Sequence, residues 1–330
     1  MDYQLIEAIY ELTLRCNLAC KHCGSTAGMP RARELALGES LALIRDLSDL
    51  GTYMITLNGG EPFLHQHWAR IGKEVVDHGI KLGLITNGYR VDDETVQAVA
   101  ALEPYEVGIS LDGGKDVHDA IRCAGSYDGA ILTMKNFMAA GVPVGVITTV
   151  SKMNLHALDD VLGAILSCGV DAWQVQVAIP MGRMDKTFIL NNEEYKQLTT
   201  FINKVRNEYD DAVFLTGADC TGLGAKNLVT EHAYMDGICG AGIDLVGIHS
   251  NGDVAGCLSM MNDDYIEGNI REKNIKDIWL NEDAFSYNRK PDGITGNCAG
   301  CDQADACRAG CKSMNIALGH PNESPYCIRF

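Results

Sequence analysis

Three cysteines near the start of the sequence have the spacing of a metal site that is left incomplete. Cys16, Cys20 and Cys23 follow one another as C-x3-C-x2-C. Structural zinc sites and most iron-sulfur clusters are closed by four protein ligands, whereas three protein ligands leave a coordination position for a substrate or cofactor. His22 would complete a zinc set, but it lies between two of the cysteines and would compete with them for geometry. The triad therefore predicts a metal centre with one open position.

A second set of cysteines lies in the last third of the sequence. The whole chain holds 13 cysteines. The N-terminus has no signal peptide, so we expect a cytoplasmic protein whose thiols are reduced and bind metal. Cys239 and Cys257 flank Gly252 as C-x12-G-x4-C. The remaining members follow as C-x2-C-x5-C-x3-C-x15-C: Cys298, Cys301, Cys307, Cys311 and Cys327. A zinc ribbon would use four of them, so seven at these spacings favour iron-sulfur clusters.

Further segments that are typical of ligand contacts each follow a short β-rich run. They are NGGEP (58–62), TNG (86–88), DGG (112–114) and PMGR (180–183). Gly59 and Gly60 allow the backbone to approach a ligand closely, and the oxygens of that segment can accept hydrogen bonds from an ammonium group. On propensity alone Asp112 and Gly113 make an ordinary turn, and Arg122 is also consistent with a solvated helix charge.

The elements that must position these segments alternate between strands and helices. Six β-rich runs predict strands at 10–14, 53–57, 81–85, 106–111, 144–150 and 172–177. Amphipathic segments between them predict helices, one of them N-capped by Asp92. Four helices are expected to end at a glycine, namely Gly51, Gly79, Gly141 and Gly169. Because a parallel return needs a crossover, we expect a parallel sheet covered by helices, either doubly wound or an incomplete (β/α) barrel. Both folds bind ligands beyond the carboxyl ends of their strands.

Beyond a further helix predicted at 191–209, the alternation of strand and helix stops. From about residue 217 the chain is rich in glycine and cysteine, so we expect its order to depend on metal more than on a large apolar core. We therefore divide the chain into a barrel at 1–190, a bridging helix and loop at 191–230, and a cysteine-rich domain at 231–330.

The composition limits the classes of partner. The chain has 330 residues, of which 46% are hydrophobic and 22% are charged, as in a globular protein with a large core. Its formal net charge of -17 disfavours nucleic acid and acidic membrane surfaces as partners, because phosphates are bound by clustered Lys and Arg. No apolar run reaches the roughly 18 residues of a membrane span.

The triad after a first strand, GGEP after a second and SLDG at the fourth resemble the radical S-adenosylmethionine (radical SAM) enzymes. The resemblance implies a partial (β/α)6 TIM-type barrel. It also implies that Cys16, Cys20 and Cys23 hold a [4Fe-4S] cluster whose fourth iron is chelated by S-adenosylmethionine. An electron from the cluster cleaves this cofactor to a 5'-deoxyadenosyl radical. The residues implied to contact the cofactor are Gly59, Gly60, Glu61, Thr86, Asn87, Ser110, Asp112 and Arg122.

The C-terminal cysteines resemble the SPASM domain, which implies two auxiliary [4Fe-4S] clusters and hence three clusters in all. In such proteins the ligand sets cross. The outer set implied here is Cys298, Cys301, Cys307 and Cys327, and the inner set is Cys239, Cys257 and Cys311.

Three cysteines remain outside these sets. We expect Cys220 to be the fourth ligand of the inner cluster. Alternatively, Cys220 is a hydrogen donor to a substrate radical, and so catalytic, or an inert loop thiol. If Cys220 is not a ligand, the inner cluster would be open to substrate. Cys168, at the end of a predicted helix, is expected to pack in the core. Cys123 lies beside the proposed cofactor loop and has no assignment.

SPASM proteins mostly modify peptides and proteins, so the resemblance implies a maturase that oxidises a ribosomally made precursor peptide at an unactivated C-H bond. The expected partners are that peptide, an electron donor such as flavodoxin or ferredoxin, and a separate leader-peptide-binding protein, because Cys16 falls very near the N-terminus. Direct recognition of the peptide by the barrel is the alternative to a separate binding protein.

Other functions are kept as alternatives. One is oxidation of a small molecule such as a haem precursor or an aminocyclitol. Another is formylglycine formation. Relatives with that activity carry an aspartate directly after the cysteine that corresponds to Cys257, whereas this chain has Leu258 there. Asp263 and Asp264 lie a few residues further on and keep that alternative open. An electron-transfer protein outside catalysis is disfavoured, because it needs neither an open cluster nor GGEP.

Overall fold

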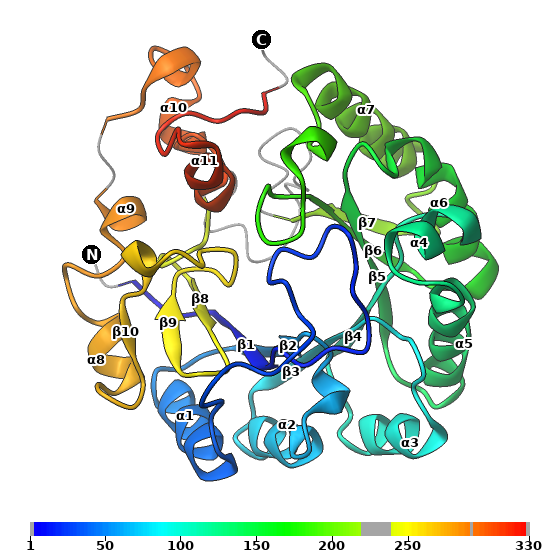
Figure 1. Cartoon of the computed structure of the whole chain (residues 1–330), viewed down its shortest axis with the longest axis horizontal. Helices are drawn as coiled ribbons and strands as arrows, with labels where there is room; N and C mark the ends of the chain where they lie inside the picture. The colour runs from blue at the N-terminus through cyan, green and yellow to red at the C-terminus, as the bar shows by residue number, and fades with distance from the viewer. Residues whose placement is uncertain (1–2, 219–238, 291–292, 328–330) are drawn as a thin grey trace.

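The computed structural model describes residues 3–218, 239–290 and 293–327. All six predicted strands are present, with ends shifted by a few residues at most. They are β1 (Glu7–Thr13), β2 (Met54–Gly59), β3 (Lys81–Thr86), β4 (Glu106–Ser110), β5 (Val144–Val150) and β6 (Ala172–Val177). Successive strands pair in parallel from β1 to β6, and the sheet curves around an interior (Figure 1).

Helices cover the outer face of this sheet, as the alternating pattern predicts (Figure 1). They are α1 (Leu37–Asp49), α2 (Trp68–Asp77), α3 (Asp93–Ala101), α4 (Lys115–Ile121), α5 (Ser126–Ala139), α6 (Leu158–Cys168) and α7 (Asn192–Glu208). Asp92 caps α3 by accepting the backbone N–H of Thr95. Gly169 ends α6 in the left-handed conformation, with φ of 75°, and the other three predicted terminal glycines also have positive φ.

The sheet is longer than the sequence pattern predicts. We expected the alternation to stop after α7, but β7 (Phe214–Gly217) pairs in parallel with β6. This strand has only four residues and one of them is an exposed phenylalanine, so its apolar pattern is too short to recognise. At the other edge, β8 (Leu245–Ile248) pairs in parallel with β1 and carries the cysteine-rich region into the same sheet.

The C-terminal region continues from β8 through short elements. They are β9 (Asp253–Ala255), β10 (Gly268–Asn269), α8 (Ile275–Trp279), α9 (Ser286–Arg289), α10 (Ala304–Cys307) and α11 (Lys312–Leu318). The strand order is β10-β9-β8-β1-β2-β3-β4-β5-β6-β7. Five short 3-10 turns complete the described elements: η1 (Pro62–Leu64), η2 (Leu155–Ala157), η3 (Lys186–Phe188), η6 (Asp263–Tyr265) and η7 (Gly296–Cys298).

Two apolar clusters stabilise these parts. The main core lies between the sheet and its helices, and it includes Ile55, Leu57 and Trp173, each at most 1% exposed. A small second cluster contains Cys239, Ala241, Ala255 and Met260. The C-terminal region also contributes buried residues to the main core, among them Trp279, Phe285 and Met314, so it buries more apolar surface than the sequence predicts. Within the described ranges, no helix is long and apolar enough to cross a membrane.

Candidate functional site

The loop that carries the first cysteine triad leaves the carboxyl end of β1 and returns to it. The backbone N–H of Gly28 donates to the Leu14 carbonyl at 2.9 Å, and the N–H of Cys16 donates to the Gly28 carbonyl at 3.1 Å. These two bonds close the loop at its base, beyond the carboxyl end of β1 (Figure 1). The thiols of Cys16, Cys20 and Cys23 lie close enough to influence one another. We call residues 14–28 the cysteine loop.

Backbone amides surround two of the three thiols. The N–H of Leu18 donates to Cys16 Sγ and the N–H of Ala27 donates to Cys23 Sγ, each at 3.4 Å. Burial is the main reason that the pKa of the Cys16 thiol is raised to about 11, and Glu61 and the thiols of Cys20 and Cys23 contribute to this rise. Amide donors to sulfur stabilise thiolates and tune iron-sulfur clusters. The loop therefore fits a cluster bound through thiolates.

The geometry differs from that of a single-ion site. In the part of the chain that the structure describes, no three Cys, His, Asp or Glu side chains converge closely enough to hold one metal ion. A [4Fe-4S] cluster does not need such convergence, because each cysteine binds a different iron. His22, which we considered as a fourth zinc ligand, instead contacts Asp112 through Nε2 at 2.9 Å.

Gly59 and Gly60 pack against the base of the cysteine loop. A Cβ on Gly59 would overlap the carbonyl oxygen of Thr13, and one on Gly60 would overlap the carbonyl oxygens of Leu14 and Arg15. The close approach that these glycines permit in the structure is thus to protein backbone, whereas the sequence suggested a ligand. The Glu61 N–H donates to the Arg15 carbonyl at 2.9 Å and fixes GGEP beside the triad.

Glu61, Thr86 and Asn87 form one buried unit from the ends of β2 and β3. The Glu61 carboxylate accepts from Thr86 Oγ1 at 2.8 Å and from the Asn87 N–H at 2.9 Å. Burial raises the pKa of Glu61 to about 7, although these hydrogen bonds oppose the shift. The Asn87 amide reaches toward the triad, with Nδ2 at 3.9 Å from Cys16 Sγ. The structure thus brings three predicted cofactor residues together beside the first cysteine.

Asp112 is fully buried after β4 and is the centre of a charged cluster. It accepts from Arg122 Nε at 2.5 Å and from His22 Nε2 at 2.9 Å. Burial raises its pKa, but Arg122 and His22 outweigh burial and hold the pKa well below its ordinary value. Asp112 therefore connects His22 of the cysteine loop with Arg122. Ser110 ends β4 nearby in sequence and is half-buried.

Two of the three inner C-terminal cysteines lie in one small apolar cluster. Cys239 and Cys257 share the second apolar cluster with Tyr287. Lys312 is only 3% exposed and follows Cys311 at the start of α11. Burial lowers the pKa of its ammonium group, and the nearby Cys239 and Cys311 oppose this shift. The N–H of Met314 donates to Cys311 Sγ at 3.5 Å. Cys239 and Cys257 thus belong to one apolar cluster, and Cys239 and Cys311 both lie near Lys312. Their role as one ligand set stays a prediction.

The outer C-terminal cysteines form a second group. Burial raises the pKa of the Cys307 thiol, and Cys298, Cys327 and Cys301 lie close enough to raise it further. Amides donate to two of these sulfurs at 3.4 Å, from Ser324 to Cys298 and from Gln303 to Cys301. The thiols of the four predicted outer ligands therefore lie close to one another.

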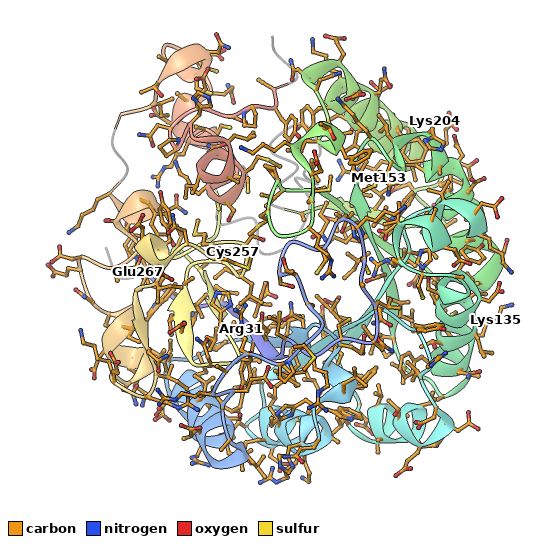
Figure 2. The ribbon with its side chains drawn as sticks, in the orientation of Figure 1. Arg31, Lys135, Met153, Lys204, Cys257 and Glu267 are labelled. Carbon is orange, nitrogen blue, oxygen red and sulfur yellow. The ribbon has the colours of Figure 1, made fainter. Side chains whose placement is uncertain are left out.

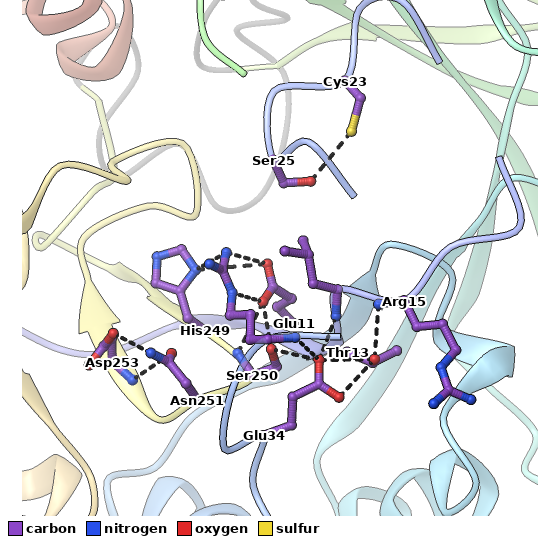
Figure 3. A network of polar contacts seen from close by, with 12 residues as sticks. Glu11, Thr13, Arg15, Cys23, Ser25, Glu34, His249, Ser250, Asn251 and Asp253 are labelled. Carbon is purple, nitrogen blue, oxygen red and sulfur yellow. Dashed lines mark hydrogen bonds and ion pairs between the residues drawn. The ribbon is translucent and has the colours of Figure 1, made fainter. Parts of the chain in front are cut away.

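A buried polar network joins the barrel to the C-terminal region, and the sequence analysis missed it (Figure 3). Glu11, on β1, accepts from Arg31 Nε at 2.6 Å and from the Ser250 hydroxyl at 2.8 Å. Glu34 accepts from the Leu14 N–H at 2.8 Å and from Ser250 Oγ at 3.2 Å. The segments before and after the cysteine loop are therefore both fixed to the turn after β8. An acidic residue inside an apolar strand pattern was the available signal.

The remaining predicted residues have less informative positions. Cys220 lies outside the described residues. Cys168 is half-buried and packs against the main core, as predicted. Asp263 and Asp264 are exposed on η6. Figure 2 shows Arg31 and Cys257 toward the interior of the ring of elements, whereas Lys135 and Lys204 lie on the outer helices α5 and α7.

Comparison with known proteins agrees with this geometry. Residues 10–165 match the model of the radical SAM superfamily, and residues 239–302 match that of SPASM, described as an iron-sulfur cluster-binding domain. The chain is 30% identical over 327 residues to the mycofactocin maturase MftC of Mycolicibacterium smegmatis, covering 96% of this chain and 80% of that protein. It is 28% identical over 336 residues to the AdoMet-dependent heme synthase of Methanosarcina barkeri, covering 97% and 95%.

Among solved structures, Streptococcus suis SuiB bound to its precursor peptide SuiA has the same fold. The TM-score is 0.80 at 17% identity, and the alignment covers 97% of this chain and 75% of SuiB. The triad on the loop after β1, the GGEP segment packed beneath it and the two C-terminal cysteine groups are thus found in a chain that matches relatives over nearly its full length. This protein belongs to the radical SAM superfamily, whose enzymes use S-adenosylmethionine and a [4Fe-4S] cluster, and it carries a C-terminal SPASM domain.

Proposed function

We propose that this enzyme oxidatively modifies a ribosomally synthesised precursor peptide, by a crosslink or a related C-H functionalisation. The observation that carries the proposal is the similarity to mycofactocin maturase MftC over nearly the whole chain. The fold of SuiB, solved with its precursor peptide, is compatible with the same substrate class. Within the superfamily, the SPASM match covers four of the seven C-terminal cysteines, namely Cys239, Cys257, Cys298 and Cys301.

The residues of the first site have distinct proposed roles. Cys16, Cys20 and Cys23 hold the [4Fe-4S] cluster, which when bound supplies the electron that cleaves S-adenosylmethionine. Arg122 contacts the cofactor carboxylate, and Asp112 orients its guanidinium through the 2.5 Å contact with Nε. This pairing leaves the other end of the planar guanidinium to face an anion.

The other proposed cofactor contacts come from the neighbouring strand ends. Gly59, Gly60 and Glu61 form one wall of the cofactor site, with Ser110 on the β4 side. Thr86 and Asn87 hold the Glu61 carboxylate in place through their 2.8 and 2.9 Å contacts. A buried carboxylate with two donors is fixed in orientation, which suits it to shape a binding site.

The C-terminal groups are proposed to hold two auxiliary [4Fe-4S] clusters, three clusters in all. Cys298, Cys301, Cys307 and Cys327 form the outer set, and Cys239, Cys257 and Cys311 form the inner one. The mutual proximity of the outer thiols supports this division. Cys220 is proposed as the fourth inner ligand. These clusters would accept the electron left after hydrogen abstraction, or bind the substrate.

The remaining partners are proposed from the chemistry. A low-potential donor such as flavodoxin or ferredoxin would reduce the first cluster in the cytoplasm. A separate small protein would bind the leader part of the peptide, with direct recognition by the barrel as the alternative.

A second candidate function is oxidation of a haem precursor. It is favoured by the similarity to the AdoMet-dependent heme synthase of Methanosarcina barkeri, of which the chain covers 95%. The MftC relative is more similar in sequence, so the peptide remains the first choice.

One experiment separates the two candidates. Reconstituted enzyme is incubated anaerobically with dithionite, S-adenosylmethionine and either a short peptide encoded beside its gene or a porphyrin precursor of haem. We expect a mass change in the peptide that requires S-adenosylmethionine and is absent with the Cys301→Ala variant. Turnover of the porphyrin with an unchanged peptide would replace the proposal by the second candidate.

A further inference from the structure

The segment that follows β6 contacts the cysteine loop from across the sheet. Four strands separate β6 from β1 in the sheet order. Nevertheless, the Arg183 N–H donates to the Cys23 carbonyl at 2.9 Å, its Nε to the Cys20 carbonyl at 2.8 Å, and its Nη1 to the Ala27 carbonyl at 2.9 Å. One residue therefore binds the loop at three points, two of which are backbone groups of triad cysteines.

The residue before it also fits the loop closely. Gly182 has φ of 59°, and a Cβ there would overlap the carbonyl oxygens of Gly24 and Cys23. A side chain at this position would be strained by the backbone conformation and would push the segment away from the loop. The segment and the loop are thus shaped for contact over several residues.

Few other contacts from outside the loop fix this part of it. The Lys21 N–H donates to the Ile121 carbonyl at 2.9 Å, and His22 contacts Asp112. Both of these hold the loop on the β4 side. Arg183 is the counterpart on the β6 side, so substitution of its side chain would remove the contacts to the Cys20 and Ala27 carbonyls and keep the backbone N–H contact to Cys23.

The charge of Arg183 adds to its geometry. Its guanidinium donates to carbonyl oxygens. Within residues 3–218, 239–290 and 293–327, no carboxylate forms an ion pair with Arg183. A cation without a paired anion beside three thiolates favours their charged form and makes a cluster easier to reduce.

From these contacts we infer that Arg183 is a positioning residue for the radical SAM cluster, acting through the backbone of Cys20, Cys23 and Ala27. The sequence analysis grouped PMGR with segments that are typical of ligand contacts, whereas in the structure Arg183 contacts the cysteine loop. This inference rests on the proposed role of the triad. It adds that the shape and potential of the cluster site depend on the sixth strand as well as the first.

The test compares Arg183→Gln, Arg183→Lys and Arg206→Gln with wild type after cluster reconstitution. Arg206 is the matched control, because its Nε also donates to a backbone carbonyl, that of Leu215 at 3.0 Å, outside the site. The readouts are the electron paramagnetic resonance signal and midpoint potential of the reduced radical cluster, identified as the signal that Cys16→Ala removes and that changes when S-adenosylmethionine is added.

We expect Arg183→Gln to lower the radical-cluster signal by about fivefold or more, since each lost hydrogen bond contributes about 1 kcal/mol. The cluster that remains should have a lower midpoint potential, and the auxiliary signals should be unchanged. Arg183→Lys should restore the potential more than the occupancy, because it keeps the charge and loses the forked contact. Gly182→Ala should reduce occupancy without the shift in potential that loss of charge produces.

A radical-cluster signal and potential in Arg183→Gln that match those of wild type and Arg206→Gln would overturn the inference. That result would leave the proposed function intact, provided that Cys16→Ala still removes the signal. If Cys16→Ala itself left the signal unchanged, the role of the triad would fail, and the inference with it.

Discussion

Glu11 accepts hydrogen bonds from both the backbone N–H and the hydroxyl of Ser250, at 3.1 and 2.8 Å, across a sequence separation of 239 residues. The first residue lies on β1 just before the cysteine triad, and the second lies in the turn between β8 and β9 that leads toward Cys257. One buried carboxylate thus connects the segment leading into the radical-cluster loop with the segment leading into the inner auxiliary group.

Glu11→Gln should therefore destabilise the protein. The substitution keeps the size of the side chain but leaves Arg31 without its charged partner, so we expect the free energy of unfolding to fall by about 2 kcal/mol. Urea unfolding at pH 7 measures this change. Lys115→Gln is the control, since it removes an exposed ion pair with Asp128 that should contribute less than about 1 kcal/mol.

The same carboxylate predicts a pH dependence. Burial raises the pKa of Glu11, but His249 and Arg31 outweigh burial and hold it well below the ordinary value of 4.5. A lowered folded-state pKa contributes stability above the unfolded-state pKa, and this contribution is lost as pH falls through the folded-state value. The difference in unfolding free energy between wild type and Glu11→Gln should shrink as pH falls below about 4.5. A difference that grows toward low pH would contradict this assignment.

Asp112→Asn should weaken binding of S-adenosylmethionine. The carboxylate holds Arg122 by a charged contact that an amide replaces with a weaker one, so we expect an affinity loss of about tenfold, corresponding to roughly 1.5 kcal/mol. Equilibrium dialysis with the reconstituted enzyme measures it. Asp92→Asn, which retains an N-cap residue on α3, should bind as wild type does. Equal affinity in all three proteins would remove Asp112 from the cofactor site.

Gly60→Ala should prevent assembly of the first cluster. Its Cβ would overlap the carbonyl oxygens of Leu14 and Arg15 and displace the base of the cysteine loop. Gly38→Ala is a matched control, because it lies in α1 and its Cβ would meet nothing within 4 Å. Iron analysis after reconstitution should show a deficit in Gly60→Ala alone. Full iron content in Gly60→Ala would show that the loop tolerates the displacement.

Cys301→Ala should impair the outer auxiliary cluster and leave the first cluster intact. We expect cleavage of S-adenosylmethionine to continue without product, because the substitution removes a ligand remote from the triad. Iron should fall by up to about four atoms per chain. Cys168→Ala, at the C-terminal end of α6, should keep both activities. Survival of product formation in Cys301→Ala would mean that the outer cluster is not where we place it.

The sequence predicted much of this fold because its signals are local. Strand periodicity, the N-cap at Asp92 and the terminal glycine Gly169 each act within a few residues, and all are present in the structure. The grouping of the C-terminal cysteines came instead from the resemblance to the SPASM domain and stays a prediction.

What the sequence could not predict depends on contacts between distant segments. Nothing in the residues near Arg183 indicates that it binds carbonyls of the cysteine loop, 156 to 163 residues away. The pairing of β8 with β1 is likewise set by tertiary packing, since LVGI is a short run. Such contacts become visible only when the sheet brings its strand ends together.

The central claim is that Cys16, Cys20 and Cys23 hold the cluster that cleaves S-adenosylmethionine. Its most direct test is to measure 5'-deoxyadenosine after dithionite reduction of reconstituted wild type and Cys16→Ala. Wild type should form 5'-deoxyadenosine and the variant should form none, because loss of one thiolate removes the iron site that binds the cofactor. Formation of 5'-deoxyadenosine by Cys16→Ala at the wild-type rate would contradict the assignment.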